Sequence, residues 1–335
     1  MEGNRTAQAQ AYLGLSLTML MWGSAFASSK AVVEQVPPAV AALLRFGGGA
    51  LALVCAVAVF GKPAAPVPFR MRARACLAGV LGVFAYNGFF FWGLSLAPSL
   101  DGGILIPVLS PVLTSLFVLL AGRERASAAR LAGLALGLAG AAVFFVGAGG
   151  GATPASSTRL AGDVCYLLAA LCWSGYTLLA PRVLAGVDPL RATTYATVTG
   201  AALLALLAAP DLAHVPWARL STGLWLNVAY LAVGAAALAN LLYYRAVASV
   251  GPASASLMMF TVPAVSTLCA FVLLGETFHP LQVVGAAVLL AGALLVITRA
   301  RREVSPGRPP RSPRRVLGRS RPAAGARSAA AGRPR

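Results

Sequence analysis

Aromatic rings, amides and a lysine occur inside long apolar stretches of this chain, where they could bind a small solute. Trp22, Phe26 and Lys30 are spaced four residues apart and therefore share one face of a helix. Amides and phenols follow in later apolar stretches, at Tyr86, Asn87, Asn227, Asn240, Tyr243 and Tyr244. Hydrocarbon offers these groups no hydrogen-bond partner, so they should face protein or water. Rings beside amides favour an amphipathic small molecule, although Tyr243 and Tyr244 could equally belong to the interfacial aromatic belt.

Three charged residues in or beside these stretches are candidates for binding or coupling. Arg45 lies inside an apolar stretch, where it could pair with Glu34 or Asp101 or bind a substrate carboxylate. Lys30 lies near the end of its stretch and could attract an anion or anchor the helix at the interface. Asp101 is the candidate for a titrating coupling group. No acidic residue lies at the centre of an apolar stretch, so the sequence does not require proton coupling.

Proline, aspartate and glycine are expected to shape the helices. Pro111 and Pro263 lie near the middle of their stretches and remove a backbone hydrogen bond, so they are hinges or static kinks. Asp163 is expected to cap a helix N-terminus, where a carboxylate complements the helix dipole. Close helix packing is expected at Gly133, Gly137, Gly140, Gly285 and Gly292.

The sequence lacks the residue patterns of catalysis, metal binding and ATP hydrolysis. The five cysteines are scattered without a CxxC spacing, and the two histidines are far apart. Neither Lys30 nor Lys62 completes a GxxxxGK[ST] loop. We therefore expect no catalytic residue, no metal site, no cofactor and no enzymatic activity.

The composition indicates that most of the chain lies in a membrane. Of 335 residues, 59% are hydrophobic and 11% are charged, and the mean hydropathy is +0.79, whereas soluble domains carry about a quarter charged residues. Stretches of a length that spans a bilayer occur at 11–33, 39–60, 75–96, 100–121, 129–148, 161–181, 191–209, 222–243, 252–274 and 280–298. We predict an all-α polytopic membrane protein with ten transmembrane helices.

Lysines and arginines collect on one predicted side of the membrane, and cytoplasmic loops keep such an excess. With the N-terminus inside, eleven of them precede the tail on the cytoplasmic side, against three (Lys30, Arg159 and Arg219) on the other. No cleavable signal peptide is apparent. The expected location is the plasma (cell inner) membrane, as a multi-pass protein with both termini in the cytoplasm.

The second half of the chain repeats the first. Offsets of 151 and 152 residues superimpose Trp22 on Trp173, Pro38 on Pro189, Gly49 on Gly200, Pro111 on Pro263, Glu124 on Glu276, Gly133 on Gly285 and Gly140 on Gly292. Each half contains five spans, and because five is odd the second copy must be inverted in the membrane. The expected domains are a first five-helix repeat at 1–148, a linker at 149–159, a second repeat at 160–298 and a disordered basic cytoplasmic tail at 299–335. Glu124 and Glu276 are expected to anchor helix ends.

The tail at 299–335 contains twelve arginines and one acidic residue, Glu303. Its mixture of Pro, Arg, Ser, Gly and Ala cannot bury enough apolar surface to fold. It also lacks aromatic residues that would stack on bases. Anionic lipid is therefore the expected partner of the tail, rather than nucleic acid.

Several sequence fragments together resemble the EamA family of the drug/metabolite transporter superfamily. They are "WGSAF" followed by Lys30, "LLRF" with Arg45, "GDVCYLLAALCWSGYTLL", "YYRAVA" and "PASASLMMFTVPAVSTLCAFVLLGE". The resemblance implies a ten-helix permease of two inverted five-helix repeats that moves small organic solutes without ATP hydrolysis. It implies a central cavity lined by spans 1, 3, 4, 6, 8 and 9, and export as the default direction.

The expected function is secondary transport of small organic metabolites such as amino acids or drugs by alternating access. A lipid-linked carrier or flippase on the same fold is the alternative. The expected partners are a small-molecule solute and membrane lipids, while the coupling ion and a homodimer are left open. The expected substrate pathway contains Trp22, Ser24, Phe26, Lys30, Arg45, Tyr86, Asn87, Trp173, Tyr176, Asn240, Tyr243 and Tyr244, with Pro111 and Pro263 as hinges and Asp101 as the coupling candidate.

Overall fold

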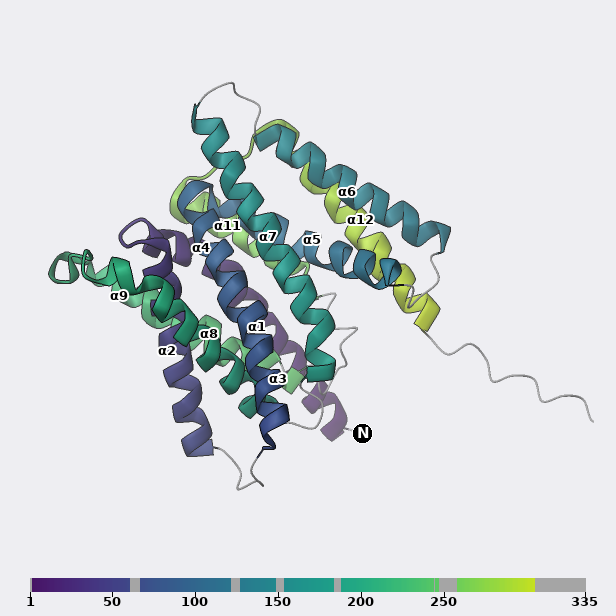
Figure 1. The fold of residues 1–335 in the computed structure, drawn as a ribbon. Coiled ribbons are helices and arrows are strands. Elements are labelled where there is room, and N and C mark those ends of the chain that lie inside the picture. Colours follow the sequence, from purple (N-terminus) through teal and green to yellow (C-terminus); the bar gives the residue numbers. More distant parts are fainter. Residues whose placement is uncertain are drawn as a thin grey trace, which may run out of the picture.

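Helices are the regular elements of the described part of the chain (Figure 1). The computed structural model describes residues 2–60, 67–121, 127–148, 154–183, 188–243, 245–246 and 258–304. Within these residues every regular element is a helix and none is a strand. This agrees with the predicted all-α class.

The helices follow the predicted apolar stretches along the chain. The first half contains α1 (Glu2–Val33), α2 (Pro38–Phe60), α3 (Phe69–Gly79), η1 (Val80–Ala85), α4 (Tyr86–Leu96), α5 (Ser99–Leu120) and α6 (Ala128–Ala148). The second half contains α7 (Pro154–Val183), α8 (Pro189–Leu212), the short 3-10 helix η2 (Trp217–Arg219), α9 (Thr222–Ala229), η3 (Tyr230–Leu238), α11 (Thr261–Leu274) and α12 (Pro280–Val304). Among the predicted stretches, 252–274 is the one that falls partly outside the described residues.

Seven helical stretches in the described part are long and apolar enough to cross a membrane. They are Pro38–Val59, Phe69–Leu96, Ser99–Leu120, Leu131–Ala148, Ser157–Leu179, Leu190–Leu212 and Thr222–Tyr243. Thr261–Leu274 and Pro280–Leu295 are shorter apolar helices. A chain with this many apolar helices is a polytopic membrane protein.

Two helix ends differ from the predicted domain boundaries. Helix α7 begins at Pro154, inside the predicted linker 149–159, because proline fits the first turn of a helix, where its missing N–H costs nothing. As a result Asp163 lies in the interior of α7, and the prediction that it caps the helix is wrong. At the other end, α12 continues to Val304, so the first residues of the predicted tail are helical and the remainder lies outside the described residues.

Helix contacts occur in pairs that correspond under the internal repeat. Helix α1 packs against α11, and its counterpart α7 packs against α5. Likewise α2 packs against η3 while α8 packs against η1, and α1 contacts α9 while α7 contacts α3. Equivalent segments of the two halves therefore make equivalent contacts, with the two halves interleaved rather than standing apart.

Helices α6 and α12 pack antiparallel along a row of glycines (Figure 1). A Cβ atom on Gly140 would overlap the backbone of Leu289, and one on Gly285 would overlap the backbone of Phe144. Gly292 likewise faces the backbone of α6. The predicted close packing at these glycines is confirmed, since the two backbones touch where no side chain intervenes.

Candidate functional site

Two π-helical segments lie at matching positions of the two halves. The segment η1 interrupts the helix from Phe69 to Leu96, and η3 interrupts the helix from Thr222 to Tyr243. A π-helical turn shifts the backbone bonding from i−4 to i−5, and such turns are frequent at functional sites. Both segments contribute residues to the cavity described below.

Side chains bond to carbonyl groups of both π-helical segments. Asn87 Nδ2 donates to Val83 O at 2.7 Å, and Asn240 Nδ2 donates to Ala236 O at 2.7 Å. The two asparagines thus make the same bond to the residue four positions earlier, in equivalent helices. In the second half, Trp22 Nε1 also donates to Ala235 O at 3.2 Å, which ties α1 to η3.

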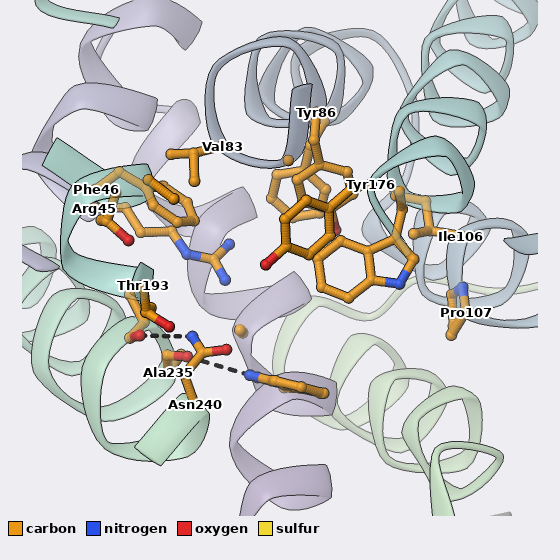
Figure 2. Close-up of a pocket in the computed structure, with 18 of the residues that line it drawn as sticks. Arg45, Phe46, Val83, Tyr86, Ile106, Pro107, Tyr176, Thr193, Ala235 and Asn240 are labelled. Atoms are coloured by element: carbon orange, nitrogen blue, oxygen red, sulfur yellow. Dashed lines mark hydrogen bonds between the residues drawn. The ribbon is translucent and has the colours of Figure 1, made fainter. Parts of the chain in front are cut away.

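A cavity of about 140 Å³ lies between the two halves. Its walls come from α1, α2, η1, α4, α5, α7, α8 and η3. The polar and aromatic residues of the predicted pathway that line it are Trp22, Phe26, Arg45, Tyr86, Trp173, Tyr176 and Asn240. In Figure 2, Arg45, Thr193 and Asn240 lie on one side of the cavity, and Ile106 and Pro107 lie on the opposite side.

Aromatic rings form most of one wall. The ring centroids of Tyr86 and Trp173 are 5.3 Å apart, those of Trp173 and Tyr176 are 5.6 Å apart, and those of Tyr86 and Phe90 are 5.9 Å apart. Phe26 packs edge-on against Phe90 at 5.4 Å. Rings at these separations hold one another in place, so the wall presents a preformed apolar surface to a ligand.

Arg45 brings a positive charge to this cavity. Its guanidinium carbon lies 5.1 Å from the ring centroid of Phe46 and 5.5 Å from that of Phe90. Its Nη1 donates to Ser29 Oγ at 3.3 Å, while its buried Nε has no hydrogen-bond partner among the described residues. Within the described residues no carboxylate pairs with Arg45. Of the alternatives for Arg45, pairing with Glu34 or Asp101 is therefore not found among these residues, and binding of a substrate carboxylate stays a prediction.

Several predicted pathway residues lie outside the cavity wall. Lys30 Nζ donates to Leu94 O at 2.6 Å and to Ala97 O at 3.1 Å, where a cation complements the C-terminal end of α4. Ser24 Oγ hydrogen-bonds to the Tyr230 hydroxyl at 2.6 Å. These residues hold α1 against neighbouring helices instead of lining the cavity.

Three further residues of the predicted substrate pathway are not among the described residues that line the cavity. Asn87 is fully buried. The ring centroid of Tyr243 lies 5.1 Å from that of Trp22, which lines the cavity. Tyr244 falls outside the described residues.

The two predicted hinge prolines occupy different environments. Pro111 is inside α5, as predicted, but the proline that lines the cavity is Pro107, one turn earlier. Pro263 lies in the first turn of α11, where proline is accommodated without a kink. Residues 259–260 form a turn directly before α11, and residues 252–257 of the predicted stretch lie outside the described residues, so the hinge role of Pro263 stays a prediction.

Sequence reasoning missed some of the cavity wall. Thr193, Thr197, Phe46, Phe90, Ile106 and Pro107 line the cavity but were not predicted. Thr193 and Thr197 are four residues apart and share one face of α8, and this polar stripe in an apolar helix is the signal that could have found them.

A separate polar cluster joins the N-terminal parts of α5, α7 and α12. Arg159 donates from Nε to Asp101 Oδ2 at 2.7 Å and from Nη2 to Asp101 Oδ1 at 2.8 Å. Gln282 Nε2 also donates to Asp101 Oδ1 at 3.0 Å. Asp101 is fully buried, and this bonding accounts for both of its oxygens. A coupling role for Asp101 stays a prediction, since its described bonds tie three helices together.

Glu276 links α11 to the start of α5. Its Oε1 accepts a hydrogen bond from Ser99 N at 2.9 Å, and its Oε2 accepts bonds from Ser99 Oγ and Leu100 N at 2.9 and 2.8 Å. A carboxylate at this position satisfies backbone N–H groups that the helix leaves free and complements the helix dipole. The predicted helix-end role of Glu276 is confirmed, whereas Glu124 lies outside the described residues.

This protein has many apolar helices in two repeats, and they surround a small cavity lined by aromatic rings. This combination is typical of membrane transporters. The model of the EamA-like transporter family matches residues 9–146 and again residues 160–298. The chain therefore belongs to the EamA-like transporter family.

Named relatives extend along nearly the whole chain. A probable terminal-alkyne amino-acid exporter of Streptantibioticus cattleyicolor is 32% identical over 310 residues, which cover 89% of this chain and 98% of that protein. The aromatic amino acid exporter YddG of Ancylobacter novellus is 27% identical and covers 85% of this chain and 96% of its own. A solved crystal structure is similar with a TM-score of 0.59 and 25% identity, over 90% of this chain and 99% of that one.

Proposed function

We propose that this protein is a secondary transporter that moves small organic solutes across the plasma membrane by alternating access. The observation that carries this proposal is the cavity, which lies between the two halves and is lined by both. Seven long apolar stretches support this proposal, and we propose that α1, α11 and α12 also cross the membrane, which would give ten spans in two inverted repeats of five. Inverted repeats can rock around a shared site and open it to one side at a time.

The paired helix contacts support the same mechanism. Equivalent packing of α1 against α11 and of α7 against α5 provides two similar surfaces along which the halves could move. The π-helical segments η1 and η3 stand at the cavity in both halves, where their irregular backbone can adapt to a ligand. We propose no enzymatic role, and a homodimer stays a prediction.

Export of small organic acids, amino acids among them, is the favoured form of this function. Two relatives carry the name of amino-acid exporters, one for terminal-alkyne amino acids and one for aromatic amino acids. The aromatic wall formed by Tyr86, Trp173 and Tyr176 suits solutes with an apolar body. The excess of basic residues on one predicted side supports a cytoplasmic location of both termini.

Transport by purified protein tests the proposal. Proteoliposomes should move at least one solute of a broad amino-acid and drug panel down an imposed gradient. Tyr86→Ala removes a ring that contacts Trp173 and Phe90, so transport should fall by about tenfold, since such ring contacts are each worth about 1 kcal/mol. Asn240→Ala should lower transport as well, because it frees the carbonyl of Ala236 at the cavity.

The control for these variants is Tyr12→Ala, which removes a tyrosine that is 44% exposed on α1 and outside the cavity. It should transport like the wild type. Vesicles that stay inert to the whole panel would argue against the proposal. Movement of lipid headgroups without any flux of soluble solute would favour a flippase instead.

A further inference from the structure

In the part of the chain that the structure describes, the cavity contains a positive charge and no counter-charge. Among the described residues that line it, Arg45 is the only one with a charged side chain. Its guanidinium is contacted by two rings and one hydroxyl, and its Nε makes no hydrogen bond. A cation in a low-dielectric site attracts an anion strongly, because there is little water to solvate either charge. An unpaired arginine inside a membrane is therefore a binding residue by default.

A second polar group without a partner lies on the same side of the cavity. Thr193 Oγ1 is buried and has no hydrogen-bond partner among the described residues, and in Figure 2 Thr193 lies on the same side of the cavity as Arg45 and Asn240. A hydroxyl can donate one hydrogen bond to a bound oxygen. Arg45 and Thr193 together present unused donors to one end of the ligand.

The end of the cavity that holds Arg45 has no charged counterpart in the second half of the chain. The residue that corresponds to Arg45 in the second half is Ala196, which also lines the cavity. The site therefore has one positive charge rather than a symmetric pair. A single charge is balanced by a monoanion, whereas a phosphate dianion would retain an unpaired negative charge.

The remaining residues of the cavity wall favour a ligand with an apolar body. Trp22, Phe26, Tyr86, Phe90, Trp173 and Tyr176 supply rings, and no described lining residue is acidic. An ammonium group on the ligand would therefore find no carboxylate in the described wall. Its charge would also oppose that of Arg45 across a small cavity.

We propose that the site binds an organic monocarboxylate with an aromatic or other apolar body, with its carboxylate on Arg45 and Thr193. The ligand carries a net negative charge, and an α-ammonium group lowers its affinity. This inference rests on the proposed transport function and narrows its substrate class. Arg45 acts as the specificity-determining residue because its planar fork matches the two oxygens of a carboxylate.

Three ligands with the same aromatic body and different charge test the proposal. Isothermal titration calorimetry of the purified full-length protein in detergent compares 3-phenylpropanoate, phenylalanine and phenethylamine. The expected order of affinity is 3-phenylpropanoate first, phenylalanine second and phenethylamine last. Equal or tighter binding of phenylalanine or phenethylamine overturns the inference.

Substitution of Arg45 tests its role directly. Arg45→Gln should weaken binding of 3-phenylpropanoate by about tenfold or more, the usual effect of losing a charge-assisted hydrogen bond, and should leave phenethylamine binding equal or stronger. Arg45→Lys keeps the positive charge but lacks the planar guanidinium, so its affinity for 3-phenylpropanoate should lie between those of the wild type and Arg45→Gln. Arg72→Gln, at an exposed arginine of α3, is the matched control and should bind like the wild type. If Arg45→Gln binds 3-phenylpropanoate as tightly as the wild type, the inference is overturned. If that variant fails to fold, the order of affinities of the wild-type protein for the three ligands decides the inference.

Transport measurements separate this inference from the proposed function. Proteoliposomes should move 3-phenylpropanesulfonate, which stays ionised and does not cross lipid unaided. Binding in the expected order without movement of any solute would contradict the transport proposal and leave the binding inference standing. If the proteoliposomes move only neutral or cationic solutes, and Arg45→Gln moves them equally well, the transport proposal stands and the binding inference is overturned.

Discussion

Asp101→Asn should lower the free energy of unfolding by about 3 kcal/mol, the lower end of the range for breaking a buried ion pair. Asp101 is fully buried, whereas the side chain of Arg159 is 23% exposed and retains some solvation. The substitution leaves the guanidinium beside a neutral amide and disturbs the bond from Gln282. Because this cluster joins α5, α7 and α12, its loss should be seen as a lower melting temperature in detergent.

Asp163→Asn is the matched comparison. Asp163 lies close to Asp101 and Arg159, but neither of its buried carboxylate oxygens has a hydrogen-bond partner in the described part of the chain. Asp163→Asn therefore removes a carboxylate that Asp101 repels and breaks no hydrogen bond. Its effect on melting should be much smaller than that of Asp101→Asn. The double variant Asp101→Asn/Arg159→Gln should recover part of the lost stability, because it removes the stranded charge as well. Equal melting of Asp101→Asn and the wild type would mean that the ion pair contributes no stability.

Gly140→Val should destabilise the protein by about 3 kcal/mol or more, beyond the usual cost of overpacking a core. The added atoms would meet the backbone of Leu289 on α12, and backbone cannot move aside as a flexible side chain can. The α6–α12 contact is the most extensive helix pair in the described structure, so the effect should extend along both helices. Thermal unfolding followed by size-exclusion chromatography measures it.

Gly88 provides a control of the same residue type. A Cβ on Gly88, in α4, would meet no atom within 4 Å. Gly88→Ala should be neutral or slightly stabilising, because alanine favours a helix by about 1 kcal/mol over glycine, whereas Gly140→Ala should be destabilising. The same sign for both alanine variants would contradict the packing argument.

The helices could be predicted because hydrocarbon imposes a simple rule on length and polarity. The glycine contacts of α6 and α12 were equally predictable, since closely packed membrane helices need small residues where their backbones meet. The helix-end role of Glu276 also follows from its position after a long apolar stretch. These features depend on local sequence or on the repeat.

Features that depend on how helices face one another could not be predicted. Asp101, Arg159 and Gln282 lie far apart in the chain, and nothing in their spacing indicates that they meet. The environment of Arg45 could not be predicted for the same reason: Asp101, one of its possible partners, is bound by Arg159 instead. The π-helical segments left no trace in the apolar pattern, although Asn87 and Asn240 mark their ends.

The difference between Arg45 and Ala196 has an electrical consequence. The charge of Arg45 stays with the protein through a cycle, whereas a monoanionic cargo would leave and carry one negative charge across the membrane. A potential of 100 mV does about 2.3 kcal/mol of work on such a charge. In a cell whose interior is negative, this voltage would drive the cargo outward without a proton or sodium ion. Transport would then be electrogenic, and its rate would rise as the membrane hyperpolarises.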